Sequence, residues 1–257
     1  MRAQNLPAAA GWSWITGGFA IFRRNPPLLG LLVMSYWFTV LLLSAIPVIG
    51  TVVASLVIPG LSVGLMQACR SLERRQPIGL QTLFASLRDN TGTLVALGAL
   101  YLACTLGILG LSTLADGGEL LRIMLSGKPV DQETLESGAL LPPATIVMLL
   151  LVPLLMAYWF APVLAAWHRL SLAKALFFSF VACWINWRAF VAYSLGLALV
   201  GAVGPGVLVA LLALMFPGAA NLLTALVTVP MVLVLAPVVF ASFYVSYRDV
   251  FGISEIA

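Results

Sequence analysis

The stretch SLAKALFFSFVACWINWRA, residues 171–189, decides how the rest of the chain is organised. It is apolar but too short to cross a membrane, and it ends just before another long apolar run. Within it, Phe180 stands six residues before Asn186. The same spacing recurs twice, each time just before a long apolar segment: Phe84 with Asn90, and Phe19 with Asn25. This recurrence predicts three copies of one unit.

The composition of the whole chain excludes an ordinary soluble globule. Of the 257 residues, 62% are hydrophobic and only 9% are charged. A soluble domain carries about 25% charged residues, so this chain has too few polar side chains to cover a surface in water. The sequence therefore predicts an all-α integral membrane protein that spans the bilayer several times.

Six apolar runs are long enough to be transmembrane helices. A hydrocarbon core of about 30 Å needs roughly 20 residues of helix. The six runs are Leu28–Ile46, Val48–Ala68, Thr93–Leu114, Ala144–Trp167, Ala189–Met215 and Leu222–Ser246. Only Pro47 separates the first two, which therefore form either a tight hairpin or one split element.

The basic residues predict which side of the membrane each segment faces. With the N-terminus inside, eleven of the thirteen Lys and Arg residues fall on the cytoplasmic side, and only Arg122 and Lys128 fall outside. The positive-inside rule therefore predicts that both termini are cytoplasmic. The acidic segment 115–143 is then a periplasmic loop with a short helix at Glu119–Leu125. This loop is either a solvated connection or a mouth that collects cations.

Three short amphipathic helices are expected in the cytoplasmic interface. When the segments are aligned on the three phenylalanines, apolar residues recur at helical spacing: Trp12, Ile15, Phe19 and Phe22; Leu80, Leu83, Phe84 and Leu87; Leu172, Leu176, Phe180 and Cys183. These helices are expected to turn their apolar faces toward the acyl chains. The side chains expected to contact lipid headgroups or the interface are Arg23, Arg24, Arg88, Arg169, Lys174, Arg188 and Arg248.

Each predicted repeat consists of one interfacial helix followed by two spans. The repeats cover residues 12–68, 78–167 and 171–250, and the middle repeat contains the loop 115–143 as an insertion. Because every copy has two spans, each copy enters from the same side and the repeats are parallel. The second span of each copy is expected to kink at a proline: Pro59, Pro162 and Pro237.

The six runs carry little chemistry. They contain no Asp, Glu, Lys, Arg or His, and His168 is expected to be an interfacial anchor at a helix end. The cysteines form no CxxC pair and are expected to pack as small hydrophobic side chains: Cys69, Cys104 and Cys183. There is no HExxH pair and no P-loop. We therefore expect no cofactor, no metal site and no enzymatic activity.

Two stretches resemble a known group of bacterial membrane proteins. The first stretch surrounds Phe180 and is carried by Ser171, Leu172, Ala175, Phe180, Ala182, Asn186, Trp187 and Phe190. It resembles uncharacterised inner membrane proteins that include the YciC-type family and the membrane region of some glycerophosphodiester phosphodiesterases. The closing SFYVSYRDVFG, residues 242–252, is similar to the end of a beta-proteobacterial branch of integral membrane proteins. The resemblance implies an inner-membrane location and brings no established reaction with it.

Two functions fit these features. In the first, a non-enzymatic protein engages membrane lipids, a protein partner or a second copy of itself through its basic interfacial helices. The alternative is a transporter or channel for a small neutral or amphipathic solute, which predicts a polar or water-filled cavity that reaches mid-membrane near Pro59, Pro162 and Pro237. The mid-span aromatics Tyr158-Trp159-Phe160 either line such a cavity or fill a helix interface. Because the basic residues are spread along the membrane edge, the net charge of +4 does not indicate nucleic-acid binding.

Overall fold

The structure is a computed structural model that describes residues 3–88, 90–126 and 140–252. All regular secondary structure in these ranges is helical, and six segments are long and apolar enough to cross a membrane. They are α2 (Pro26–Ser44), α3 (Ile49–Glu73), α5 (Thr91–Asp116), α8 and α9 (Leu141–Trp159, Ala161–His168), α11 to α12 (Trp187–Ala198, Gly204–Met215) and α13 (Ala220–Phe251). The predicted six-span helical architecture is confirmed.

Shorter helices lie between the spans. They are α1 (Ala10–Phe22), α4 (Gln81–Ala85) with its 3₁₀ turn η1 (Ser86–Arg88), α6 (Glu119–Ser126) and α10 (Leu172–Ile185). Helix α6 confirms the short helix predicted at the start of the acidic loop. Residues 127–139 of that loop lie outside the described residues.

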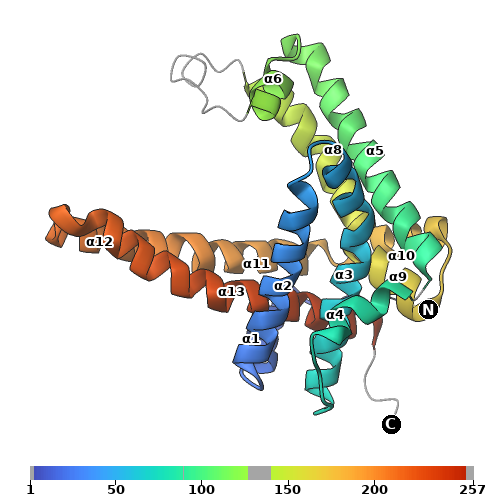
Figure 1. Cartoon of the computed structure of the whole chain (residues 1–257), viewed down its shortest axis with the longest axis horizontal. Helices are drawn as coiled ribbons and strands as arrows, with labels where there is room; N and C mark the ends of the chain where they lie inside the picture. The colour runs from blue at the N-terminus through green and yellow to red at the C-terminus, as the bar shows by residue number, and fades with distance from the viewer. Residues whose placement is uncertain (1–2, 89, 127–139, 253–257) are drawn as a thin grey trace.

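The spans pair into three helical hairpins. Helix α2 packs on α3, α5 packs on α8, and α12 packs on α13. The third hairpin leaves the others at a steep angle and forms an arm (Figure 1). Between α2 and α3 the chain turns within four residues, and Val48 takes a left-handed φ of +60°. The predicted break at Pro47 is therefore a tight hairpin.

The two ends of the described chain lie on the same side of the molecule. The Gln4 amide donates a hydrogen bond to the Val250 carbonyl at 2.8 Å. Helix α6 lies at the opposite end of the second hairpin (Figure 1). An even number of spans requires this arrangement of the termini.

The three short helices that precede the hairpins pack in a cyclic order. Helix α4 packs on α3 and α10 packs on α8 and α9, so each lies against the second span of the hairpin before it. Helix α1 completes the cycle by packing on α13 and α11 of the third hairpin. This order could not be predicted from local sequence patterns, because it depends on contacts between distant segments.

At the aligned position, these helices bury the residue before the phenylalanine rather than the phenylalanine itself. Gly18, Leu83 and Ser179 are all buried against a neighbouring hairpin, whereas Phe19 and Phe84 are 44% and 43% exposed. The aligned asparagines Asn25, Asn90 and Asn186 each occupy the N-cap position of the following span. The three-repeat hypothesis stays a prediction.

The tightest packing lies at the end of the molecule where the termini meet. Trp14, Phe160 and Tyr247 are completely buried there, and the ring centroids of Phe160 and Tyr247 lie 6.1 Å apart. Cys183 in α10 is also buried, and burial raises the pKa of its thiol to about 12. This inert environment agrees with the expected role of that cysteine as a small hydrophobic side chain.

Candidate functional site

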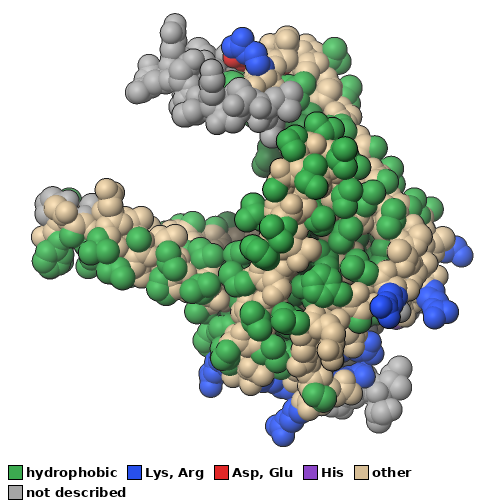
Figure 2. Space-filling view, in the orientation of Figure 1, with side chains coloured by type: hydrophobic (Ala, Val, Ile, Leu, Met, Phe, Trp, Pro, Cys, Tyr) green, Lys and Arg blue, Asp and Glu red, His purple; other side chains and the backbone are tan. Residues whose placement is uncertain are grey.

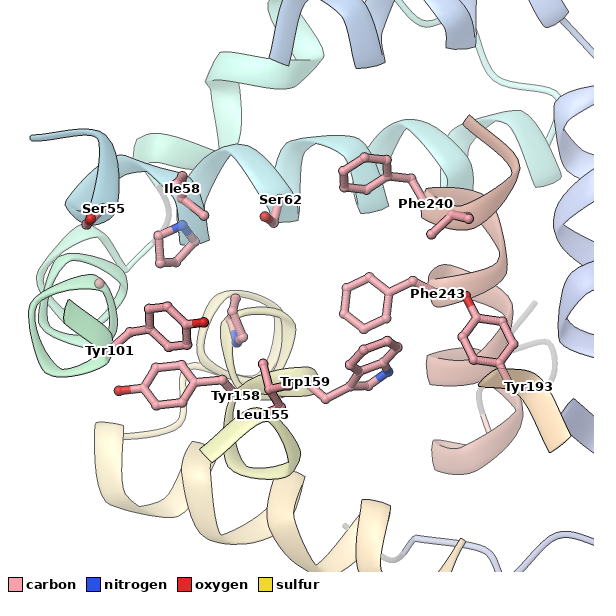
Figure 3. A pocket seen from close by; sticks show the side chains of 14 residues that line it. Ser55, Ile58, Ser62, Tyr101, Leu155, Tyr158, Trp159, Tyr193, Phe240 and Phe243 are labelled. Atoms are coloured by element: carbon pink, nitrogen blue, oxygen red, sulfur yellow. The ribbon is translucent and has the colours of Figure 1, made fainter. Parts of the chain in front are cut away.

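A cavity of about 480 Å³ lies where the three hairpins meet. Its walls come from α3, α5, α8, α9, α11 and α13 (Figure 3). Pro59 and Pro162 line it, and Val239, two residues after Pro237, lines it as well. Arg70 follows Pro59 by 11 residues, or about 16 Å of helix, so the cavity lies about half a bilayer core away from the basic end.

Six of the fourteen residues that line the cavity are aromatic. They are Tyr101, Tyr158, Trp159, Tyr193, Phe240 and Phe243. The rings of Tyr101 and Tyr158 meet edge to face with centroids 5.1 Å apart, and those of Trp159 and Phe243 do so at 5.3 Å. Both Tyr158 and Trp159 line the cavity, and Trp159 also fills a helix interface, since its ring lies 5.6 Å from that of Phe190 in α11.

The cavity contains few polar groups and no charged ones. The Tyr101 hydroxyl points into the cavity (Figure 3), and Ser62 lines the adjoining wall on α3. Tyr193 is occupied elsewhere, since its hydroxyl and the Ser242 hydroxyl are hydrogen-bonded at 2.6 Å. Leu155, another lining residue, is 41% exposed, so the cavity is open beside α8.

Close packing at Pro59 fixes one wall. Proline has no amide hydrogen, so the Ser55 carbonyl, four residues earlier, lacks its usual helical donor. Helix α5 approaches at this point, and a Cβ added to Gly98 would lie 2.3 Å from that carbonyl oxygen. Only glycine allows the two backbones to approach so closely.

A second wall is shaped by a break in the fourth span. Pro162 was expected to kink a continuous helix, but α8 ends at Trp159 and α9 begins at Ala161. The Ser179 hydroxyl accepts a hydrogen bond from the Phe160 amide at 2.9 Å and donates one to the Met156 carbonyl at 2.8 Å. It thus stands between the two groups that would bond to each other in an unbroken helix. Pro59 and Pro237 lie inside α3 and α13, as expected.

Most of the predicted basic residues are exposed at the end of the molecule opposite α6. Lys and Arg side chains gather along that edge (Figure 2), and the exposed ones include Arg23, Arg88, Arg169, Lys174 and Arg188. Their contact with lipid headgroups stays a prediction. The structure does not bring them into one cluster with the cavity.

The two remaining predicted residues make specific contacts within the protein. The Arg24 guanidinium donates to the Leu72 and Glu73 carbonyls at the C-terminus of α3. Arg248 forms ion pairs with Glu73 and Asp249. The predictions overlooked Glu73, although it is the first acidic residue of the chain and stands at the basic end of a span.

His168, at the C-terminus of α9, lies beside the last span. Its Nε2 atom and the Tyr247 hydroxyl are hydrogen-bonded at 2.6 Å. Next to it, the Arg70 guanidinium lies 4.8 Å from the centre of the Trp167 ring. These contacts join α3, α9 and α13 at the basic end, and the interfacial role of His168 stays a prediction.

One relative establishes the family of the chain. A probable inner membrane protein of Burkholderia thailandensis is 37% identical over 261 residues, which cover 99% of this chain and 96% of the relative. The chain belongs to the family of that inner membrane protein. No family model matches the chain, and no solved structure does. This relative confirms the predicted inner-membrane location. The resemblance to YciC-type proteins stays a prediction.

This inner membrane protein also contains a GxSxG pattern, which the predictions overlooked. It is Gly60-Leu61-Ser62-Val63-Gly64, and its serine faces the cavity. In hydrolases this pattern forms a sharp turn between a strand and a helix, whereas here it lies inside the continuous helix α3. Within the described residues there is also no group of three His, Cys, Asp or Glu side chains that could hold a metal ion. The geometry of the cavity therefore suits binding of an uncharged molecule.

Proposed function

We propose that this inner membrane protein is a non-enzymatic carrier that binds a small uncharged or amphipathic solute inside the bilayer. The observation that supports the proposal is the cavity near Pro59 and Pro162, to which all three hairpins contribute. Sites for small molecules typically measure about 300–1,000 Å³ and combine apolar walls with a few polar groups. A volume of about 480 Å³, a wall rich in aromatic side chains and the inward Tyr101 hydroxyl match that description.

The absence of charge from the wall narrows the solute class. A charged solute would lose its hydration in this cavity without gaining a counter-ion, and this would cost several kcal/mol. An aromatic or aliphatic body would instead pack against the rings. One hydroxyl, carbonyl or amide could bond to Tyr101 or Ser62 without any charged partner.

Binding of an uncharged aromatic probe tests this proposal. The full-length protein in lipid nanodiscs is titrated with N-phenyl-1-naphthylamine, whose fluorescence rises in apolar surroundings, and empty nanodiscs give the background. We expect saturable binding that Leu155→Trp weakens about tenfold, since the larger ring fills the cavity. Leu149→Trp, on an exposed part of the same helix, is the matched control. Binding that does not exceed the background, or that Leu155→Trp leaves unchanged, would overturn the proposal.

A second candidate function is engagement of anionic lipid by the basic end of the molecule. The observation that favours it is the row of exposed Lys and Arg side chains along one edge (Figure 2). Each basic side chain near an anionic surface contributes about 1 kcal/mol of attraction. Replacing Arg23, Arg88 and Arg169 together with Gln is expected to lower the anionic lipid that copurifies; unchanged lipid content would count against this function. Binding of a protein partner or a second copy there stays a prediction.

This candidate function includes an orientation in which the basic end is cytoplasmic and the loop that begins at α6 is periplasmic. Arg122 in α6 has a side chain that is 79% exposed, so Arg122→Cys provides an accessible label. In intact spheroplasts, a membrane-impermeant maleimide is expected to label this variant, whereas Arg88→Cys reacts only after the membrane is opened. The opposite labelling pattern would reverse the orientation.

A further inference from the structure

A second hollow lies between α1 and the arm, away from the central cavity. It measures about 360 Å³. One side is formed by α1, with Trp12, Ile15 and Phe19, and the other by the arm, with Val200, Val234 and Val238. Thr16 also faces it, but its hydroxyl donates to the Trp12 and Ser13 carbonyls of its own helix. The wall is therefore apolar, and we call this hollow the α1 groove.

The arm side of the α1 groove has an irregular backbone. Val200 belongs to a π-helical segment, η2 (Leu199–Val203), which joins α11 to α12. A π-helical turn inserts one extra residue and locally widens a helix, and such turns are common at functional sites. The opening between α1 and the arm is therefore built into the backbone of the fifth span.

A cation stands at the basic end of the α1 groove. Arg23 is exposed, and its guanidinium carbon lies 5.9 Å from the centre of the Phe19 ring, which is itself part of the wall. The positive charge of Arg23 therefore lies directly beside the apolar wall, at Phe19. Glu73, the first acidic residue of the chain, is paired with Tyr244 and Arg248. Its carboxylate therefore does not compete with an external anion for Arg23.

We propose that the α1 groove binds one phospholipid with an anionic headgroup. One acyl chain lies along the apolar wall, and the headgroup phosphate pairs with Arg23. The groove alone would accept any apolar chain, but the adjacent guanidinium adds a charge-assisted hydrogen bond to phosphate oxygen. This proposal makes the lipid-engagement function specific to one site and rests on it, but it is independent of the central cavity.

Native mass spectrometry of the full-length protein tests the site. The detergent-solubilised protein is incubated with phosphatidylglycerol, and we expect one tightly retained copy. Arg23→Gln is expected to weaken its retention about fivefold or more, since it removes the cation stacked on Phe19 in the groove wall. Val234→Trp fills the groove and is expected to have a similar effect.

Matched variants separate this site from general attraction to lipid. Arg74→Gln removes another exposed cation, at the C-terminus of α3, and Val232→Trp enlarges an exposed side chain outside the groove on α13. Both are expected to retain the lipid like the unmodified protein, and glycerol 1-phosphate, which lacks acyl chains, is not expected to be retained. Equal weakening by Arg23→Gln and Arg74→Gln would overturn the site while leaving the general lipid function standing. Full retention by both Arg23→Gln and Val234→Trp would overturn the site as well.

Discussion

The Tyr244 hydroxyl donates a hydrogen bond to the Glu73 carboxylate at 2.5 Å, and this contact joins the first hairpin to the last helix of the chain. Arg248, one turn after Tyr244, pairs with the other oxygen of the same carboxylate. Glu73 therefore receives two donors from α13 at the point where α3 ends. The first and third hairpins are held together here by polar contacts, whereas elsewhere the arm diverges from the bundle (Figure 1).

Removing the charge of Glu73 is expected to destabilise the protein. The side chains of Glu73 and Arg248 are only 25% and 32% exposed, so Glu73→Gln leaves a half-buried guanidinium with Asp249 as its remaining acidic partner. Hydrogen bonds to charged groups contribute about 1.5–3 kcal/mol, and we expect a loss in that range. Thermal melting of the purified protein in detergent measures it.

The ion pair between Arg122 and Glu119 is the control for that measurement. Its two side chains are 79% and 39% exposed, and pairs of this kind contribute at most about 1 kcal/mol. Glu119→Gln is therefore expected to leave the melting temperature unchanged within error. An equal loss in the two variants would show that the Glu73 contacts are no stronger than a surface pair.

Ser179→Ala is expected to destabilise the break between α8 and α9. The alanine variant leaves the Phe160 amide and the Met156 carbonyl without the hydroxyl that now bonds to both. An unsatisfied buried polar group costs about 1–3 kcal/mol, so the melting temperature should fall by several degrees. Ser194→Ala, on an exposed face of α11, serves as the control and should have little effect. An unchanged melting temperature in Ser179→Ala would mean that the span closes into a continuous helix.

Hydropathy was sufficient to predict the spans, but not the contacts between them. The six apolar runs and the break at Pro47 follow from local composition, and the structure reproduces them within a few residues at most ends. The break at Phe160 could not be predicted from Pro162 alone, because Ser179, 19 residues later, completes it. The role of Arg24 at the end of α3 depends similarly on a partner 48 residues away.

The cavity was predicted only in outline, and the prediction that it is polar or water-filled was wrong, since its wall is mainly apolar. Prolines in the second spans indicated where helices would bend, and two of the three line the cavity. The size of the cavity and its aromatic wall depend on how three hairpins that are distant in sequence pack together. No local sequence pattern predicts that packing. The GxSxG residues show the opposite case, since a local pattern is present but the surrounding helix gives it no hydrolase geometry.

Gly98→Ala is expected to disturb the cavity as well as the stability. The new Cβ would lie 2.3 Å from the Ser55 carbonyl oxygen and 2.7 Å from the Leu56 Cα, so α5 would have to move away from α3. Overpacking of this kind typically costs about 1–3 kcal/mol, and probe binding in the cavity should weaken with it. Gly107→Ala in the same helix meets no atom within 4 Å and should be neutral or slightly stabilising. If both variants melt and bind alike, the close approach of α3 and α5 is not needed.

Asn186 holds the N-terminal segment onto the bundle, and its removal is expected to release that segment. Its side chain is 1% exposed, its Oδ1 accepts from the Leu6 amide at 2.8 Å, and its Nδ2 donates to the Gln4 and Ala182 carbonyls at 2.8 and 2.9 Å. Asn186→Ala removes all three bonds and leaves buried backbone groups unpaired, at a cost of about 2–4 kcal/mol. Limited proteolysis followed by mass spectrometry should then detect cleavage before Ala10, where the unmodified protein resists.

Asn25, another of the aligned asparagines, separates this tether from ordinary helix capping. It accepts one hydrogen bond from the Leu28 amide at 3.3 Å and, among the described residues, makes no contact of this kind with a distant segment. Asn25→Ala is therefore expected to cost about 1 kcal/mol and to leave the N-terminal segment protected. Asn186→Asp keeps the acceptor for Leu6 but loses both donors, so it should fall between the two alanine variants. If Asn25→Ala and Asn186→Ala expose the segment to the same degree, the asparagines act as equivalent caps, and the segment is held by its remaining contacts, such as the bond between Gln4 and Val250.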